Sequence, residues 1–379
     1  MSEQHGGPVV LKSIEEVAKF QRDLIPLNIS EGFSVNPMLN DIAAESDIRA
    51  GIIAFRDFLF GFCDHLILDG HTYAKPPNKP ANVSDYPFLA NVTNVLAEIG
   101  YYSKFSETGD SLLVSELPSC TPVIDEKGKK KSPKINGVGL IESLRFLSLC
   151  GLVFTGVDST QIDLTVKKID IQEIESFEAS YPDNPNMLTG LKVMSIAEME
   201  LRPTRRYWGD NNILRCDYRL LSTEASDVFE FLKDYIHPLP EKVQEFVMNL
   251  HQRYVDKGLT CIMTILGDIH FAYSKINDSQ RKKLSDRDIY TKRVFGISMS
   301  LRFGYCLVVR SKKTDKYPDV IKTFPVSLQK KISRGYGCDR KMWGTPCQHS
   351  CQGIRIPLDD SIIDISKDIK TWLDNEVSS

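Results

Sequence analysis

The chain has 379 residues, 42% of them hydrophobic and 26% charged, and its formal net charge is -3. These values are typical of a soluble globular protein of two domains, and they exclude collagen-like, coiled-coil and wholly disordered chains. The polar first residues lack a signal-peptide pattern and the apolar runs are far shorter than the roughly 20 residues of a membrane span, so we expect a cytoplasmic protein without membrane contact.

Residues 1–36 are predicted to be a lead-in segment, and residues 37–239 an N-terminal α+β domain. Ser13, with Glu16 three residues later, predicts the start of a helix over Ser13–Leu24. Apolar residues at helical spacing predict further helices, and short apolar runs between turn residues predict strands. The helices are expected at Asp41–Leu68, Phe88–Ile99, Gly139–Cys150, Met187–Leu201 and Asp227–Tyr235, and the strands at Leu112–Leu117, Val153–Thr155 and Asn212–Leu221.

The order helix, strand, basic loop, helix and strand between Phe88 and Thr155 is compatible with a winged-helix-like unit. The basic loop of this unit would be Lys127–Lys134. A plain α+β scaffold with a solvated loop explains the same order. The second helix carries Arg145 as its one basic residue, which is a poor composition for reading DNA bases.

His237–Pro240 is the predicted linker, and residues 240–379 are predicted to be a C-terminal basic α+β domain with a Cys/His loop. A helix is expected at Glu241–Lys257, and alternating apolar residues predict an antiparallel sheet. The strands of this sheet are expected at Leu259–Leu266, Ile269–Tyr273, Val294–Leu301 and Tyr305–Val309, followed by helices at Pro318–Ser333 and Ser366–Asn375.

Three segments carry a resemblance to uncharacterised cytoplasmic proteins of clostridial-type bacteria. They are YPDNPNMLTGLKVM (Tyr181–Met194), KTDKYPDVIKTFP (Lys313–Pro325) and CQGIRIPLDDSIIDISKDIKTWLDNE (Cys351–Glu376). The resemblance covers nearly the whole chain but implies no activity, so it assigns no catalytic residue.

Charge is divided unevenly along the chain. Residues 1–239 carry a formal charge of -11 and residues 240–379 a charge of +8, and the stretch from Arg281 to Arg355 holds 18 basic and 5 acidic residues. Such a concentration of cations attracts polyanions, above all nucleic acid. The candidate polyanion-binding residues are Lys282, Lys283, Arg293, Arg310, Lys312, Lys313, Lys330, Lys331, Arg334, Arg340 and Lys341, with Tyr336 and Trp343 as candidates for base stacking. Solvated faces neutralised by the acidic half are the alternative explanation.

One group of cysteines is dense enough to carry chemistry. Cys338, Cys347, His349 and Cys351 lie within fourteen residues of one another, inside the glycine-rich loop Gly335–Gly353. Three thiolates and one imidazole form a complete tetrahedral Zn²⁺ site, although the spacing differs from the common paired CxxC pattern. The same residues also allow free thiols or a redox pair of Cys347 with Cys351.

These features favour a cytoplasmic binding or regulatory protein that engages a polyanion through its C-terminal domain and is not an enzyme. The first alternative is a small-molecule-binding protein or a thiol-dependent enzyme with a pocket near the Cys338–Cys351 loop. The second is an interaction scaffold in which the acidic half docks on the basic half. Motifs of phosphate-binding loops, nucleophile elbows and zinc proteases do not occur in the chain.

Overall fold

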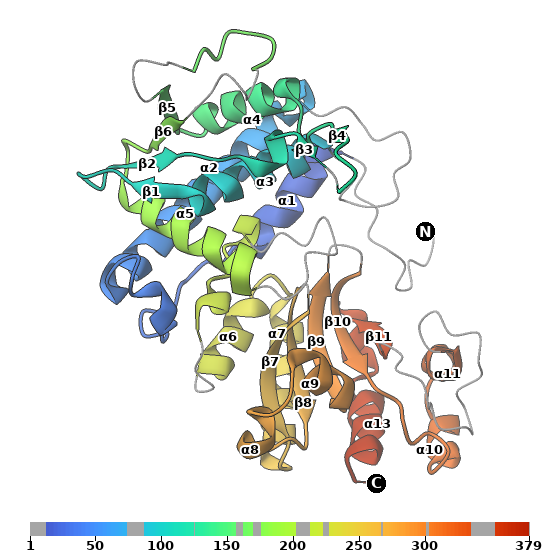
Figure 1. The fold of residues 1–379 in the computed structure, drawn as a ribbon. Helices are drawn as coiled ribbons and strands as arrows, with labels where there is room; N and C mark the ends of the chain where they lie inside the picture. Colours follow the sequence, from blue (N-terminus) through green and yellow to red (C-terminus); the bar gives the residue numbers. More distant parts are fainter. Residues whose placement is uncertain are drawn as a thin grey trace. The chain divides into compact units, whose positions relative to one another are not determined.

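The structure is a computed structural model of the chain. It describes residues 13–73, 87–124, 126–156, 162–169, 176–201, 213–222, 227–266, 268–300, 303–334 and 353–378. Helices and antiparallel sheets occur together, which confirms the predicted α+β class (Figure 1). Within the described residues, no helix is both long and apolar enough to cross a membrane.

The chain divides into two compact units, Val10–Asp227 and Val228–Ser379. The division precedes helix α6 (Val228–Tyr235), whereas the sequence predicted it after residue 239. Tyr235 explains why α6 groups with the second unit. Its hydroxyl donates to the carbonyl of Ile269 at 2.9 Å and accepts from the amide of Met299 at 2.8 Å. His237–Pro240 is therefore a turn inside the second unit.

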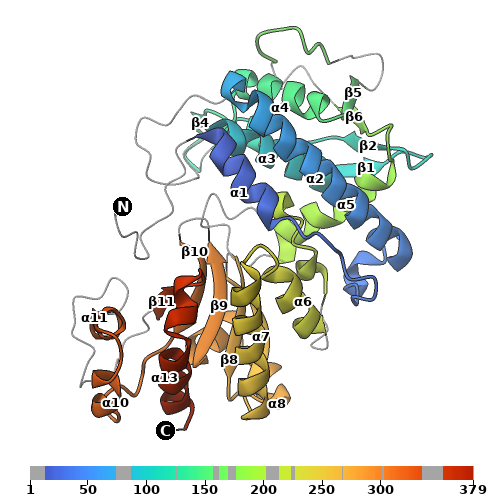
Figure 2. The same cartoon turned by 180° about the vertical axis from the view of Figure 1, so that it is seen from behind.

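Helices form the core of the first unit. Ser13 caps α1 by accepting a hydrogen bond from the amide of Glu16 at 3.2 Å, as predicted. The helices of the first unit are α1 (Ile14–Leu24), α2 (Glu45–Tyr73), α3 (Pro87–Tyr101), α4 (Gly137–Leu149) and α5 (Asn186–Ile196). The π-helix Ala197–Leu201 continues α5. Helices α3, α4 and α5 have more than half of their residues buried. Figure 2 shows α1, α2 and α5 together on one side of this unit.

A four-stranded antiparallel sheet packs on these helices in the order β1-β2-β6-β5. The strands are β1 (Ser103–Phe105), β2 (Ser111–Val114), β5 (Val153–Gly156) and β6 (Phe177–Ser180). Leu112, Val114 and Phe177 point into the core, while Leu113 between them is 37% exposed. This alternation is that of a sheet with one solvent face.

The winged-helix hypothesis gains no support from this arrangement. Strands β2 and β5 do not pair with each other, because β6 lies between them. The basic loop forms a separate two-stranded hairpin of β3 (Val123–Ile124) and β4 (Lys130–Lys131). The finding is a helix-backed sheet with an exposed basic hairpin.

The predicted strand Asn212–Leu221 is wrong. From Ile213 onward this segment forms two short 3-10 helices, η7 (Ile213–Arg215) and η8 (Tyr218–Leu221), with Cys216 between them at a φ of 48°. Its residues are buried on all sides, so the apolar pattern that suggested a strand instead reflects complete burial. Arg219 forms a buried ion pair with Asp217 in the same segment.

The second unit is built on a five-stranded antiparallel sheet in the order β11-β10-β9-β8-β7. The strands are β7 (Thr260–Leu266), β8 (Asp268–Ser274), β9 (Phe295–Ser300), β10 (Gly304–Val309) and β11 (Ile354–Pro357). Its longer helices are α7 (Glu241–Asp256) and α13 (Ser366–Ser378), and its shorter ones are α8 (Asp278–Arg281), α9 (Asp286–Lys292), α10 (Pro318–Lys322), α11 (Val326–Arg334) and α12 (Ser361–Asp364).

Helices cover both faces of this sheet (Figures 1 and 2). On one face α7 and α13 supply the core, with the rings of Tyr254 and Phe295 5.1 Å apart and Trp372 fully buried. On the other face Ile289 of α9 packs with Ile262 and Ala272. The sheet is thus largely buried on both sides.

Two features of the second unit differ from the sequence prediction. The helix expected at Pro318–Ser333 is divided into α10 and α11, because Pro325 lacks the N–H that a continuous helix requires. Strand β11 was not predicted. It pairs with β10 through Ile354 and Val309, and Ile356 and Leu307, residues separated by a long stretch of sequence.

Candidate functional site

Three strand ends meet at one end of the five-stranded sheet. Phe295, the first residue of β9, lies opposite Tyr273 of β8 and opposite Val309, the last residue of β10. Neighbouring strands are about 4.8 Å apart, so the loops that leave β8 and β10 and the helix that leads into β9 come together here. They carry Lys275, Lys292, Lys312, Lys313 and Lys316, which we call the lysine cluster.

The lysine cluster concentrates positive charge in a small region. Four of its members are exposed and Lys313 is half-buried. Burial lowers the pKa of Lys313, and the nearby ammonium groups of Lys275 and Lys316 lower it further. A concentration of like charges of this kind attracts an anionic ligand.

A buried carboxylate fixes the loop that carries three of these lysines. Glu376 of α13 is 3% exposed. Its carboxylate accepts hydrogen bonds from the amides of Lys312 at 3.1 Å and Lys313 at 3.3 Å, and from the hydroxyl of Tyr317. The ammonium group of Lys313 also donates to the Glu376 carbonyl at 3.0 Å. The buried carboxylate therefore holds the backbone of this loop in place by accepting its hydrogen bonds.

The carboxylate of Asp374, also near this end, is engaged in three hydrogen bonds. Asp374 accepts from Arg253 and Lys257, each at 2.6 Å, and from the hydroxyl of Tyr254 at 2.9 Å. Asp315 is half-buried in the loop that carries the cluster. The described surface here is therefore cationic, with Asp315 as the one carboxylate between residues 311 and 317.

The predicted polyanion-binding residues are distributed over several elements. Lys312 and Lys313 belong to the lysine cluster, and Arg334 ends α11. Lys282 and Lys283 are exposed in the turn between α8 and α9, and on α11 Lys330 is exposed while Lys331 is half-buried. The candidates outside the described residues are Arg340, Lys341, Tyr336 and Trp343.

Two of the predicted polyanion-binding residues, Arg293 and Arg310, are buried and do not belong to an accessible surface. Arg293 is 1% exposed, and its guanidinium lies 3.4 Å from the centroid of the Tyr290 ring and donates to the Tyr290 carbonyl. Arg310 is 7% exposed and donates to the carbonyl of Thr291 at 2.6 Å. Both arginines hold the end of α9 against the sheet.

Sequence analysis missed Lys275, Lys292 and Lys316 as partners of Lys312 and Lys313. A usable signal was present, because the predicted antiparallel strands already place the residues after β8 and β10 at the same end of the sheet. Charge density along the chain does not report this topology. The role of Glu376 had no signal in the sequence.

The predicted zinc ligands Cys338, Cys347, His349 and Cys351 lie outside the described residues. Within the part that is described, no cluster of three or more His, Cys, Asp or Glu side chains could hold a metal ion. The zinc site stays a prediction from the sequence.

Buried thiols are protonated at neutral pH. Burial raises the pKa of Cys63, Cys120 and Cys261 to about 12. The pKa of Cys306 reaches about 11, because burial outweighs the opposing effect of Arg355 and the half-buried Lys331. A thiol nucleophile needs a lowered pKa, so these four cysteines do not support a thiol-dependent enzyme.

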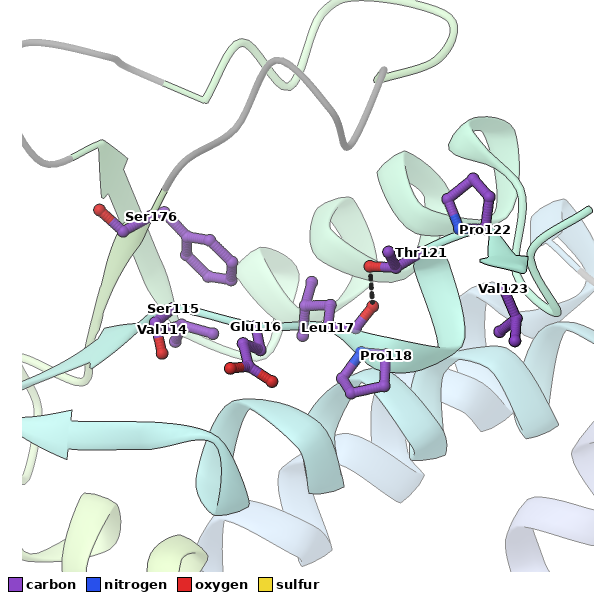
Figure 3. A pocket seen from close by; sticks show the side chains of 10 residues that line it. Val114, Ser115, Glu116, Leu117, Pro118, Thr121, Pro122, Val123 and Ser176 are labelled. Atoms are coloured by element: carbon purple, nitrogen blue, oxygen red, sulfur yellow. Dashed lines mark hydrogen bonds between the residues drawn. The ribbon is translucent and has the colours of Figure 1, made fainter. Parts of the chain in front are cut away.

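A cavity of about 430 Å³ lies in the first unit where β2 and β6 separate. Val114, Leu117 and Phe177 form its apolar floor, and Pro118 and Thr121 are among the residues at its side. Figure 3 shows the Thr121 hydroxyl donating to the Leu117 carbonyl, at 3.0 Å. The cavity is large enough for a small molecule, but it is distant in sequence from the Cys338–Cys351 loop.

Comparisons with known proteins give no match. No family model matches the chain, and neither a curated protein sequence nor a solved structure resembles it significantly. The resemblance to clostridial-type proteins stays a prediction.

Proposed function

We propose that this chain is a cytoplasmic binding protein, not an enzyme, whose second unit engages a polyanion such as nucleic acid through the lysine cluster. The observation that carries the proposal is the convergence of five lysines from two loops and the end of α9 at one end of the sheet, with the loop after β10 held by Glu376. This surface is smaller than the one expected from the sequence, because Arg293 and Arg310 are buried.

The test is a titration of fluorescein-labelled single-stranded DNA at several salt concentrations. If the five lysines neutralise up to five phosphates, the logarithm of the association constant should fall with the logarithm of salt concentration with a slope of up to about -3.5. The double variant Lys312→Gln, Lys316→Gln should reduce this slope by about 1.4. Absence of binding to DNA and RNA at low salt would exclude the proposal.

Lys242→Gln is the matched control. Lys242 is exposed near the start of α7. Lys257, just after the other end of that helix, is paired with Asp374, which lies near the end of the sheet that carries the lysine cluster. A helix of this length spans about 24 Å. Lys242→Gln removes the same charge at a distance and should leave the slope nearly unchanged.

We propose separately, from the sequence, that Cys338, Cys347, His349 and Cys351 bind structural zinc. Elemental analysis of protein purified without chelator should then find about one zinc ion per chain. A chelator should lower the melting temperature, because metal binding and folding are coupled. Negligible metal together with unchanged stability would exclude this site and favour the redox pair or free thiols.

The cavity beside β2 and β6 favours a second candidate function, the binding of a small apolar molecule. Its floor of Val114, Leu117 and Phe177 offers contacts to an apolar body. A thermal-shift screen of metabolites should then identify a stabilising compound. Phe177→Ala should lower the affinity for that compound by about tenfold and so reduce the thermal shift. Stabilisation that is unchanged in this variant would place the compound elsewhere.

A further inference from the structure

The lysine cluster also indicates which part of a polyanion it contacts. We infer, on the basis of the proposed function, that it recognises the phosphate chain and not the bases, so that single-stranded nucleic acid and inorganic polyphosphate compete for the same surface. The inference depends on where the tyrosines and arginines of the basic stretch lie.

The nearest tyrosines are engaged inside the protein. Arg293 covers one face of the Tyr290 ring, and the ring of His270 lies 5.0 Å from it. Tyr317 is 6% exposed, and its hydroxyl donates to Glu376. Stacking of a base requires an accessible aromatic face, and these two rings are already in contact with other side chains.

Tyr305, which lies between Tyr290 and Tyr317 in the sequence, also has its ring and hydroxyl in contact with other residues of the unit. The ring of Tyr305 packs 5.4 Å from that of Tyr235, and its hydroxyl donates to the Tyr235 carbonyl at 2.6 Å. At Phe303 the guanidinium of Arg355 lies 4.6 Å from the ring centroid. The aromatic residues between 290 and 317 that the structure describes therefore serve the packing of the unit.

Base edges are read by groups that form paired hydrogen bonds, and arginine is the commonest of them. The buried arginines at this end of the sheet, Arg293 and Arg310, donate to backbone carbonyls inside the unit, and the partly exposed Arg253 is paired with Asp374. The ammonium group of Lys313 donates to the Glu376 carbonyl, and that of Lys312 lies 3.5 Å from the Thr291 carbonyl. Lys275, Lys292, Lys312 and Lys316 are nevertheless exposed, and their ammonium groups act as compact point charges. They suit phosphate oxygens, whose spacing along the chain does not depend on sequence.

The experiment compares ligands that share the phosphate chain and differ in their bases. Full-length protein is titrated with labelled oligothymidylate and with an abasic oligomer of the same length, and inorganic polyphosphate is added as competitor. We expect the two oligomers to bind within about twofold of each other and polyphosphate to displace both. The variant Lys312→Gln, Lys316→Gln should weaken both oligomers alike, by about tenfold, while Lys242→Gln should not.

The outcomes separate this inference from the proposed function. Each stacked base raises affinity by between about fivefold and about 150-fold. Weaker binding of the abasic oligomer by that margin, or failure of polyphosphate to compete, would overturn the inference while polyanion binding stands. No binding of either oligomer or of polyphosphate would overturn both. Competition by polyphosphate for a base-independent complex would support both.

Discussion

Glu376 is a buried acid whose carboxylate accepts from four donors in the segment after β10: the hydroxyls of Ser311 and Tyr317 and the amides of Lys312 and Lys313. Burial raises its pKa, and the bonds from Tyr317, Lys312 and Lys313 oppose this effect. Replacing the side chain would leave two amides and two hydroxyls without this acceptor, which is more costly than the loss of an exposed pair.

We therefore expect Glu376→Ala to lower the free energy of unfolding by about 3 kcal/mol. Urea denaturation followed by circular dichroism measures the change. Glu245 is exposed on α7, and Glu245→Ala should change stability by no more than about 0.5 kcal/mol. Equal effects of the two substitutions would contradict the role assigned to Glu376.

His251 gives the second unit a dependence on pH. The ring is 7% exposed, and its Nδ1 lies 2.9 Å from the hydroxyl of Tyr273. Burial lowers its pKa below the ordinary value of 6.5. The folded state therefore binds a proton less readily than the unfolded state, and stability is lost as the pH falls below about 6.5 toward the folded pKa.

His251→Asn removes this titration while it keeps a polar group near Tyr273. Urea midpoints measured at about pH 7.5 and about pH 5.5 should differ less in the variant than in the natural protein. An equal difference in both proteins would show that His251 does not contribute to the pH dependence.

At the scale of elements, the crossing of α2 and α5 depends on two glycines in contact. A Cβ atom at Gly190 would collide with the carbonyl oxygen of Gly51 and would lie 2.7 Å from the Cβ of Phe55. A Cβ atom at Gly51 would lie 2.7 Å from the Gly190 nitrogen. The two helix backbones therefore approach too closely for any larger residue at either position.

Gly190→Ala should lower the free energy of unfolding by about 3 kcal/mol, because the two helices must move apart. Gly61 is the control within α2, since a Cβ atom there would meet nothing within 4 Å. Gly61→Ala should raise stability by up to about 1 kcal/mol through its higher helix propensity. Equal destabilisation by both substitutions would show that the close approach of α2 and α5 does not set the cost.

Local patterns predicted most elements because their signals are local. The Ser13 cap and the apolar stripe of α7 identified helices correctly. The strand predicted at Asn212–Leu221 was wrong, because complete burial gives an apolar pattern in a 3-10 helix as well as in a strand. Strand β11 was not predicted, because its pairing with β10 is a long-range interaction that no local pattern reports.

At the scale of the whole molecule, the position of α6 decides where the second unit begins. Tyr235 is 4% exposed, and its ring packs 5.1 Å from Phe271 and 5.4 Å from Tyr305. A fragment that begins at Pro240 lacks this residue and leaves the amide of Met299 without its bond to the Tyr235 hydroxyl. Loss of a large buried side chain costs about 3 kcal/mol or more.

We expect a fragment of residues 228–379 to unfold cooperatively on heating, and a fragment of residues 240–379 to melt lower and less cooperatively. Circular dichroism in the far and near ultraviolet measures both. Equal melting temperatures would return the boundary to the position that the sequence predicted, after residue 239.

Composition, periodicity and the charge division by themselves determined the α+β class, most helices and strands, and the basic character of the second half. These are properties of the residues and their near neighbours. Only the tertiary structure decided which cations are usable: it buried Arg293 and Arg310 and brought Lys275 to Lys313 and Lys316. Accessibility and proximity depend on which strand ends meet and on which side chains satisfy buried carbonyls, and such long-range contacts are not encoded in any short stretch of sequence.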